Sequence, residues 1–180
     1  MNELIQKANT FAAVKHSGQT RKYTNEPYVL HPISVARRVS EFLDSLPNER
    51  FPADSKAEMV AAALLHDTVE DTDATVEEIE MLFGKTVAMY VWYLTDSPKY
   101  TGNRAHRKSM DCQRLGSAPA EVKVIKVFDF MDNAPSIKEN DPRFFQQFLL
   151  EKMALFDAMD IENLTFHGAT LPLDQTIYSV

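Results

Sequence analysis

An apolar run at residues 59–65 constrains the fold of this chain more than any other feature of the sequence. At helical spacing this run has no polar side, so it predicts a helix that is buried on every face. We expect Asp54 or Ser55 to cap its N-terminus. A helix buried in this way must be surrounded by other elements, and the rest of the sequence predicts that these are helices too.

Apolar residues recur at helical spacing along most of the chain. The 180 residues include only 5 glycines, and no long stretch alternates apolar with polar residues. The sequence therefore predicts an all-α, compact single-domain helical bundle of about eight helices. They are expected at 3–15, 32–46, 55–65, 76–83, 85–95, 103–115, 118–128 and from 142 onward. Pro32 is expected to open the second helix, Gly84 to end the fourth and Asp141 to start the last, with Thr75 and Ser117 as caps.

The last part of the chain differs from the rest. From about Ile161 no periodicity is visible, and Gly168 and Pro172 interrupt the pattern. We assign residues 1–160 to the helical domain and residues 161–180 to a short irregular C-terminal tail, which packs on the domain or extends from it.

Charge and cysteine content exclude several classes of protein. The chain has 19 basic and 26 acidic residues, a net charge of −7, which disfavours a DNA- or RNA-binding protein. Cys112 is the only cysteine, so no intrachain disulfide forms, as is usual in a reducing compartment. No signal peptide or membrane span is apparent. We expect a cytoplasmic protein with a small-molecule partner, and leave homo-oligomerisation open.

Ionisable residues follow the buried run directly. His66 and Asp67 come first, and Glu70 and Asp71 lie one turn later. Burial of an unpaired charge costs several kcal/mol, so a compensating partner is expected, and a metal ion would supply it. Nitrogen and carboxylate ligands together suit Mn, Fe, Zn, Co or Ni. A His-Asp pair alone is common, and the two later acids are also compatible with an ordinary helix turn.

Two more candidates lie far away in the sequence. His31 precedes Pro32 at an expected helix start, and Asp129 lies inside an apolar helical segment. Either residue alone is compatible with a hydrogen-bonded core position. Together with His66 and Asp67 they form the ordered set His, His-Asp, Asp.

This ordered set resembles the HD superfamily of metal-dependent phosphohydrolases. Residues 11–22, 26–32 and 65–72, and the later Phe83-Gly84, resemble the hydrolase domain of RelA/SpoT homologues. The length is similar to that of a stand-alone small alarmone hydrolase. The resemblance implies an HD-type helical fold and an enzyme that hydrolyses a nucleotide.

The resemblance also implies roles for individual residues. One Mn²⁺, or another divalent transition metal, would be held by His31, His66, Asp67 and Asp129. Glu70 and Asp71 match the catalytic acid pair, which orients and deprotonates the attacking water. Nucleotide contacts are implied for Arg21, Lys22 and Asn133.

Basic residues outside these motifs are weaker candidates. Arg143 is a candidate for the other phosphate end of the substrate, and the basic segment at residues 104–108 for further phosphate contacts. A solvated surface is the more usual explanation of both. Tyr28 and the aromatic residues at 144, 145 and 148 are expected to be core residues.

The chain departs from the family pattern beside the last ligand. Phe130 stands where the family has a basic residue, and Asp132 stands where it has an aromatic or histidine ring. The site thereby loses a cation and gains an anion, which leaves base and phosphate specificity open.

The resemblance implies a Mn-dependent (p)ppGpp 3′-pyrophosphohydrolase that releases GDP or GTP and pyrophosphate. One alternative is a hydrolase of a related nucleotide, either a ppApp pyrophosphohydrolase or an NADPH phosphatase. A second alternative is a catalytically weak nucleotide sensor.

Overall fold

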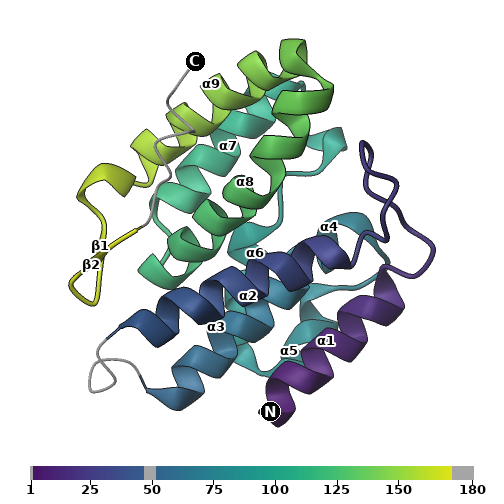
Figure 1. Ribbon diagram of the computed structural model, residues 1–180, viewed down its shortest axis with the longest axis vertical. Helices are drawn as coiled ribbons and strands as arrows, with labels where there is room; N and C mark the ends of the chain where they lie inside the picture. The colour runs from purple at the N-terminus through teal and green to yellow at the C-terminus, as the bar shows by residue number, and fades with distance from the viewer. Residues whose placement is uncertain (1, 47–51, 172–180) are drawn as a thin grey trace.

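The computed structural model describes residues 2–46 and 52–171, and these form an almost entirely helical molecule (Figure 1). The all-α prediction is confirmed. In chain order the elements are α1 (Glu3–Lys15), α2 (Leu30–Ser45), α3 (Ala53–Leu65), α4 (Thr68–Asp71), α5 (Val76–Phe83), α6 (Lys85–Leu94), the 3-10 helix η1 (Lys99–Thr101), α7 (Arg104–Gly116), α8 (Ala120–Asn140), α9 (Pro142–Ala158), the 3-10 helix η2 (Ile161–Asn163), β1 (Thr165–Phe166) and β2 (Ala169–Thr170).

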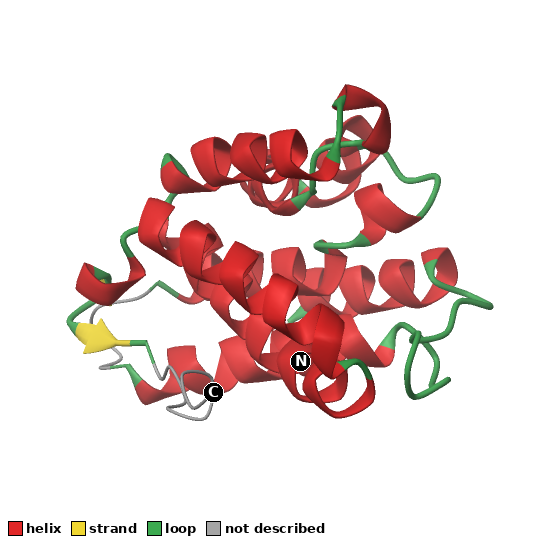
Figure 2. Cartoon of the chain, turned by 90° about the horizontal axis from the view of Figure 1, so that it is seen from above, coloured by secondary structure: helices red, strands yellow, loops and turns green. Residues whose placement is uncertain are grey.

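The apolar helix α3 is central, as predicted. Every residue from 59 to 65 is buried, and α1, α2, α6 and α8 all pack against this helix. Figure 1 shows α7, α8 and α9 together on one side and α1, α2 and α3 on the other, and Figure 2 shows the same bundle from above. The contact of α2 with α8 joins the two sides and brings distant parts of the sequence together.

Phe130 belongs to the core rather than to the functional site. Its side chain is 1% exposed, stacks on Phe148 at a centroid distance of 5.5 Å and meets Phe156 edge-on at 5.2 Å. The substitution of a basic residue by Phe130 therefore adds packing between α8 and α9, because aromatic pairs of this kind favour such geometries.

Several predicted helix starts are wrong by one or more residues. Pro52, not Asp54 or Ser55, precedes α3, and α2 begins at Leu30, which places His31 and Pro32 in its first turn. Ser117 does not cap α8. Its hydroxyl donates to the carbonyl of Arg114 at the end of α7, and α8 starts only after Pro119.

The other predicted caps are confirmed. The Thr75 hydroxyl accepts a hydrogen bond from the Glu78 amide at 3.2 Å, and Gly84 ends α5 with φ of 90°. The Asp141 carboxylate accepts from the Phe144 amide, also at 3.2 Å, where α9 begins. These are short-range signals, and local sequence was sufficient to identify them.

The described part of the C-terminal tail packs on the bundle. Strands β1 and β2 form a small antiparallel hairpin that pairs Thr165 with Thr170. Phe166 is 2% exposed and lies 6.1 Å from the Phe42 ring. Residues 172–180 of the predicted tail lie outside the described residues.

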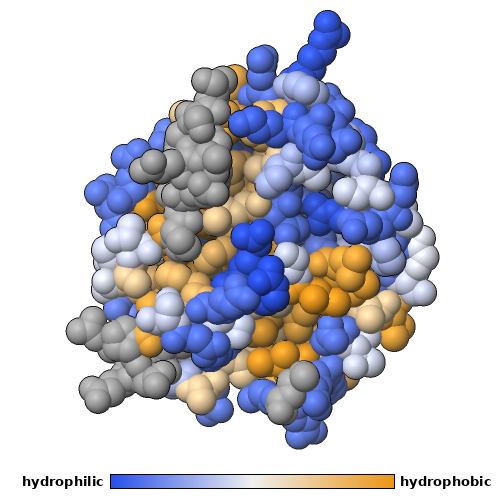
Figure 3. Space-filling view, in the orientation of Figure 1, coloured by the Kyte–Doolittle hydropathy of each residue, from blue (hydrophilic) through white to orange (hydrophobic). Residues whose placement is uncertain are grey.

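The surface is mixed in character. In the view of Figure 3, hydrophilic residues cover the centre and upper right, and apolar residues gather lower down. Among the described residues, no helix combines the length and hydrophobicity that a membrane span requires.

Candidate functional site

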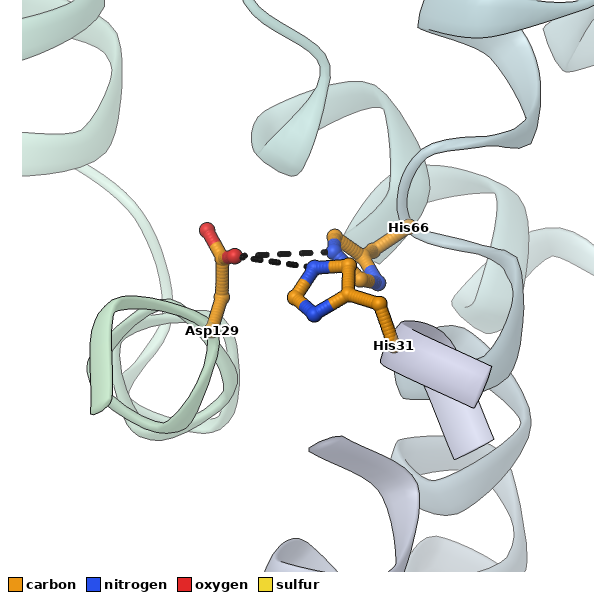
Figure 4. A group of neighbouring side chains, drawn as sticks. All are labelled: His31, His66 and Asp129. Carbon is orange, nitrogen blue, oxygen red and sulfur yellow. Dashed lines mark ion pairs between the residues drawn. The ribbon is translucent and has the colours of Figure 1, made fainter. Parts of the chain in front are cut away.

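Three helices place a compact group of potential metal ligands at the middle of the bundle. His31 comes from the first turn of α2, His66 follows the last residue of α3, and Asp129 lies within α8. One ligand atom from each lies within 4.8 Å of the others, and Figure 4 shows Asp129 facing both rings. The Asp129 oxygen Oδ1 is 3.3 Å from His31 Nε2 and 3.8 Å from His66 Nε2.

Asp67 joins this group from the turn between α3 and α4. Its Oδ2 is 3.4 Å from His31 Nε2 and 3.1 Å from His66 Nε2. The regular helix α3 ends at Leu65, and in the turn that follows the adjacent His66 and Asp67 side chains converge. All four predicted ligands are thus brought together. We call these four residues the ligand cluster.

The hydrogen bonds of the two histidines determine which nitrogen faces the cluster. His66 Nδ1 donates to the Ala63 carbonyl at 2.8 Å, and its buried Nε2 has no hydrogen-bond partner. His31 Nδ1 lies 2.7 Å from the Asp132 carboxylate, and donation there leaves Nε2 as the acceptor. The Nε2 lone pairs of the two histidines and the carboxylates of Asp67 and Asp129 then face a common point. An orphaned buried nitrogen in such a donor set fits a divalent transition metal.

The charges of the cluster support each other strongly. Burial opposes the protonated form of both histidines, but the surrounding carboxylates outweigh it and raise the pKa of His31 to about 11 and that of His66 to about 9. The same attractions hold the pKa of Asp67 and of Asp129 well below the usual range despite their burial. A metal ion would take the place of these protons.

Lys126 completes the cluster from one turn earlier on α8. Its side chain is 6% exposed, and its Nζ lies 3.1 Å from Asp129 Oδ2 and 3.8 Å from Asp96 Oδ1. Burial lowers the pKa of this ammonium, but the carboxylates outweigh the effect and raise it, so the lysine stays charged. Lys126 was not among the predicted site residues, although a lysine inside an apolar helix, three residues before a buried Asp, is a usable signal.

The predicted catalytic acids lie on α4 at the edge of the cluster. Glu70 and Asp71 line a pocket of about 620 Å³ that also contains Asp96, Arg107 and Lys108. Partial withdrawal from water and the carboxylates of Asp96 and Asp67 raise the pKa of Glu70 to about 7. Burial and Asp67 also raise the pKa of Asp71. A carboxyl that titrates near neutrality suits proton transfer at physiological pH.

A smaller pocket of about 280 Å³ adjoins the first and shares Asp96, Arg104, Lys108 and Asp111 with it. Its remaining lining includes Asn133, Lys152 and Phe144. We call the two pockets together the basic groove.

The cations of the basic groove differ in their partners. Arg104 pairs with Glu151 at 2.7 Å, and Lys108 pairs with Asp96. Lys152 has no carboxylate at ion-pair distance among the described residues, and its Nζ lies over the Phe148 ring at 5.4 Å. Burial and the neighbouring Lys126 lower the pKa of Lys152. The Nε of Arg107 is buried without a hydrogen-bond partner.

The predicted substrate residues fall into two groups. Arg21 donates to Asp132 and Asn133, both at 3.0 Å, and Asn133 donates to Asp129 Oδ1 at 2.7 Å. Asn133 shares the helix face of Asp129, as the four-residue spacing predicted. Lys22 is 73% exposed and lies 3.9 Å from Asp141. Arg143 is exposed on α9 and lines neither pocket of the basic groove.

Tyr28 was expected to be a core residue, and this prediction is wrong. Its hydroxyl donates to Asp67 Oδ2 at 2.7 Å. Burial and the carboxylates of Asp67 and Asp71 raise the pKa of this phenol, so it remains protonated and able to donate. The short spacing between Tyr28 and His31 was the only available signal.

Comparison with known proteins extends these observations. The family model of the HD domain matches residues 8–158, a range that includes the ligand cluster and both acids. A guanosine-3′,5′-bis(diphosphate) 3′-pyrophosphohydrolase of Aquifex aeolicus is 39% identical over 141 residues, which cover 75% of this chain but only 18% of that protein.

A shorter relative and a solved structure match over more of their length. The zebrafish (Danio rerio) guanosine-3′,5′-bis(diphosphate) 3′-pyrophosphohydrolase MESH1 is 37% identical over 136 residues, 73% of this chain and 68% of that protein. The structure of a metazoan ortholog of SpoT, described as hydrolysing ppGpp, aligns with a TM-score of 0.77 at 28% identity. That alignment covers 99% of this chain and 95% of the other.

Proposed function

The chain belongs to the HD domain family, and on that premise we propose that it hydrolyses guanosine-3′,5′-bis(diphosphate) and its 5′-triphosphate counterpart. The products are pyrophosphate and GDP or GTP. The observation that carries the proposal is the meeting of two imidazole Nε2 atoms with the Asp67 and Asp129 carboxylates beside the Glu70 acid.

The metal of this site is proposed to be one Mn²⁺, held by His31, His66, Asp67 and Asp129. When bound, such an ion lowers the pKa of a coordinated water and polarises the phosphoryl group. Other divalent transition metals satisfy the same ligands. Lys126 keeps the second oxygen of Asp129 engaged and so fixes the orientation of this carboxylate.

The two acids of α4 move the protons of the reaction. Water attacks the phosphorus atom that is attached to the ribose 3′-oxygen, and the bond between this phosphorus and the 3′-oxygen breaks. Glu70, with a pKa of about 7, accepts the proton that the water loses. The 3′-oxygen takes up a proton as it leaves, and we assign its donation to Asp71, whose pKa is also raised. Tyr28 holds Asp67 in place beside them.

The basic groove is proposed to hold the phosphates that do not react. Lys152 has no carboxylate partner among the described residues, and the Arg107 Nε has no hydrogen-bond partner, so both are available to an anion. Phosphate oxygens accept several charge-assisted hydrogen bonds at once. Arg143, which lies outside the groove lining, is proposed only for the far end of a longer polyphosphate.

The base and ribose are proposed to lie near Arg21, Lys22 and Asn133. Because the Arg21 donors point to Asp132 and Asn133, the face of its guanidinium remains for stacking on a purine. Stacking does not distinguish guanine from adenine. This observation favours ppApp as a second substrate.

We place this reaction in the cytoplasm and on free nucleotides rather than on DNA or RNA. The net charge of −7 opposes a long polyanion, whereas Lys152 and Arg107 of the basic groove offer cations to a small one.

The test is incubation of the protein with Mn²⁺ and ppGpp, pppGpp, ppApp or NADPH, with products separated by ion exchange. The proposal predicts pyrophosphate from ppGpp and pppGpp, and at least about 10²-fold slower release with E70Q. Release of phosphate from NADPH, without turnover of the other nucleotides, would show that the substrate is not the proposed alarmone. Nucleotide binding without turnover in the presence of bound Mn²⁺ would instead indicate a sensor.

A further inference from the structure

Asp132 makes more contacts to the site than its place outside the ligand cluster suggests. This carboxylate is 12% exposed and lies on α8 between the cluster and a pocket that also contains Arg21 and Arg38. Its Oδ2 is 2.7 Å from His31 Nδ1 and 3.0 Å from Arg21 NH1. Its Oδ1 is 3.9 Å from Arg38 Nε.

The charge of Asp132 is therefore compensated rather than free to repel phosphate. Arg21 and Arg38 flank it on one side, and the His31 N–H faces it on the other. From the sequence alone, Asp132 is an added negative charge near the substrate. In the structure Arg21, Arg38 and His31 compensate this charge.

One oxygen atom, Oδ2, receives both His31 and Arg21. A carboxylate that accepts the Nδ1–H of a metal-binding histidine fixes the tautomer and the ring orientation of that histidine. The same oxygen holds a guanidinium that also donates to Asn133 at 3.0 Å. Movement of Asp132 would therefore disturb a metal ligand and a nucleotide residue together.

We propose that Asp132 is a positioning residue that holds His31 for the metal and Arg21 for the nucleotide through a single carboxylate oxygen. The His31 half depends only on the metal site. The Arg21 half rests on the proposed function, because it requires a purine nucleotide as the ligand.

The His31 half is tested by Mn²⁺ titration followed by electron paramagnetic resonance, in which the free ion is visible. D132A should raise the Mn²⁺ dissociation constant about 10–100-fold, the range typical for loss of a partner of a metal-bound histidine. D132N should raise it less, because its side-chain oxygen can still accept the His31 proton. The matched control is D157N, which removes a carboxylate from an exposed position of α9 outside the pocket of Asp132 and should change nothing. Wild-type affinity in D132A would overturn the proposal.

Imidazole proton and nitrogen spectroscopy at saturating Zn²⁺, a diamagnetic ion, separates positioning from general damage to the fold. In D132A the Nδ1–H signal of His31 should lose its hydrogen-bonded shift and exchange faster with water, whereas that of His66, held by the Ala63 carbonyl, should keep the wild-type pattern. Equal changes at both histidines would indicate disruption of the fold and contradict a specific role.

The Arg21 half is tested by ppGpp binding at saturating Mn²⁺ in the inactive E70Q background. R21A and D132A should each weaken ppGpp binding, and the double variant should be no weaker than the poorer single one. Additive losses would overturn the coupling. If E70Q binds no ppGpp, this half fails together with the proposed substrate, while the Mn²⁺ affinity and the imidazole signals still decide the His31 half.

Discussion

The ligand cluster and the basic groove handle buried charge in opposite ways. In the cluster, Asp129 contacts His31, His66 and Lys126, so each charge is compensated within the protein. In the groove, Lys152 is left beside other cations with no carboxylate at ion-pair distance among the described residues. A preformed set of opposed charges suits a resident ion, whereas an uncompensated cation suits a ligand that comes and goes.

Removal of a cluster carboxylate should have the largest effect. D67A leaves two buried imidazoles with one carboxylate fewer and should abolish both Mn²⁺ uptake and pyrophosphate release, reducing activity to background. Metal analysis after gel filtration and a ppGpp assay give the two readouts. The exposed acid Asp73 provides the control, since D73N should retain both properties. Activity in metal-free D67A would break the link between cluster and chemistry.

Loss of Glu70, the proposed base, should separate metal binding from turnover. E70Q should lower kcat about 10²–10⁴-fold, as removal of a general base does, while Mn²⁺ remains bound. In the wild type, the rising limb of log kcat with pH should bend near pH 7, where Glu70 becomes deprotonated. This limb should be absent from E70Q. E80Q, an exposed change on α5, is the control. An unchanged pH profile in E70Q would exclude Glu70 as the base.

Removal of the Lys152 charge from the basic groove should weaken ppGpp binding but stabilise the folded protein. K152M should raise KM for ppGpp about tenfold, the cost of one charge-assisted hydrogen bond. Because burial lowers the pKa of Lys152, the folded state disfavours its charge; this penalty is complete below the lowered pKa and fades as pH rises through it. K152M should therefore melt at a higher temperature than wild type. K85M, on the exposed face of α6, should alter neither quantity. A lower melting temperature of K152M than of the wild type would contradict the claim that the Lys152 charge is uncompensated.

The smallest effect is expected at the boundary between the two regions. Y28F removes the hydroxyl that donates to Asp67 and should lower kcat/KM about fivefold, equivalent to about 1 kcal/mol for one hydrogen bond. Steady-state kinetics of Y28F beside Y100F, in which an 89% exposed tyrosine is changed, measures it. A loss as large as that of E70Q would make Tyr28 part of the proton-transfer machinery.

Local signals in the sequence were sufficient for much of the fold. The apolar run before His66 predicted the central helix, and the Thr75 and Asp141 caps and Gly84 are confirmed. Ser117 misled because Pro119 delays α8 and leaves the serine hydroxyl to the end of α7. The hairpin at residues 165–170 carried too short a pattern to be predicted.

The site divides in the same way. His66 and Asp67 were visible because they follow buried sequence, while His31 and Asp129 became candidates only when taken together with that pair. The contact between His31 and Asp132 joins residues 101 positions apart, and no periodicity encodes it. The role of Lys152 likewise depends on the approach of α9 to α7 and α8. Such contacts are properties of packing and are not visible in any single segment.

The most direct test of the resident metal site is the stoichiometry of Mn²⁺ binding in the absence of nucleotide, measured by titration of the wild type, E70Q and D67A. One ion per chain in the wild type and in E70Q, with none in D67A, is the predicted result. Equal binding by all three, or no binding by the wild type, would contradict the central claim that the ligand cluster holds the ion and that Glu70 and Asp71 act beside it.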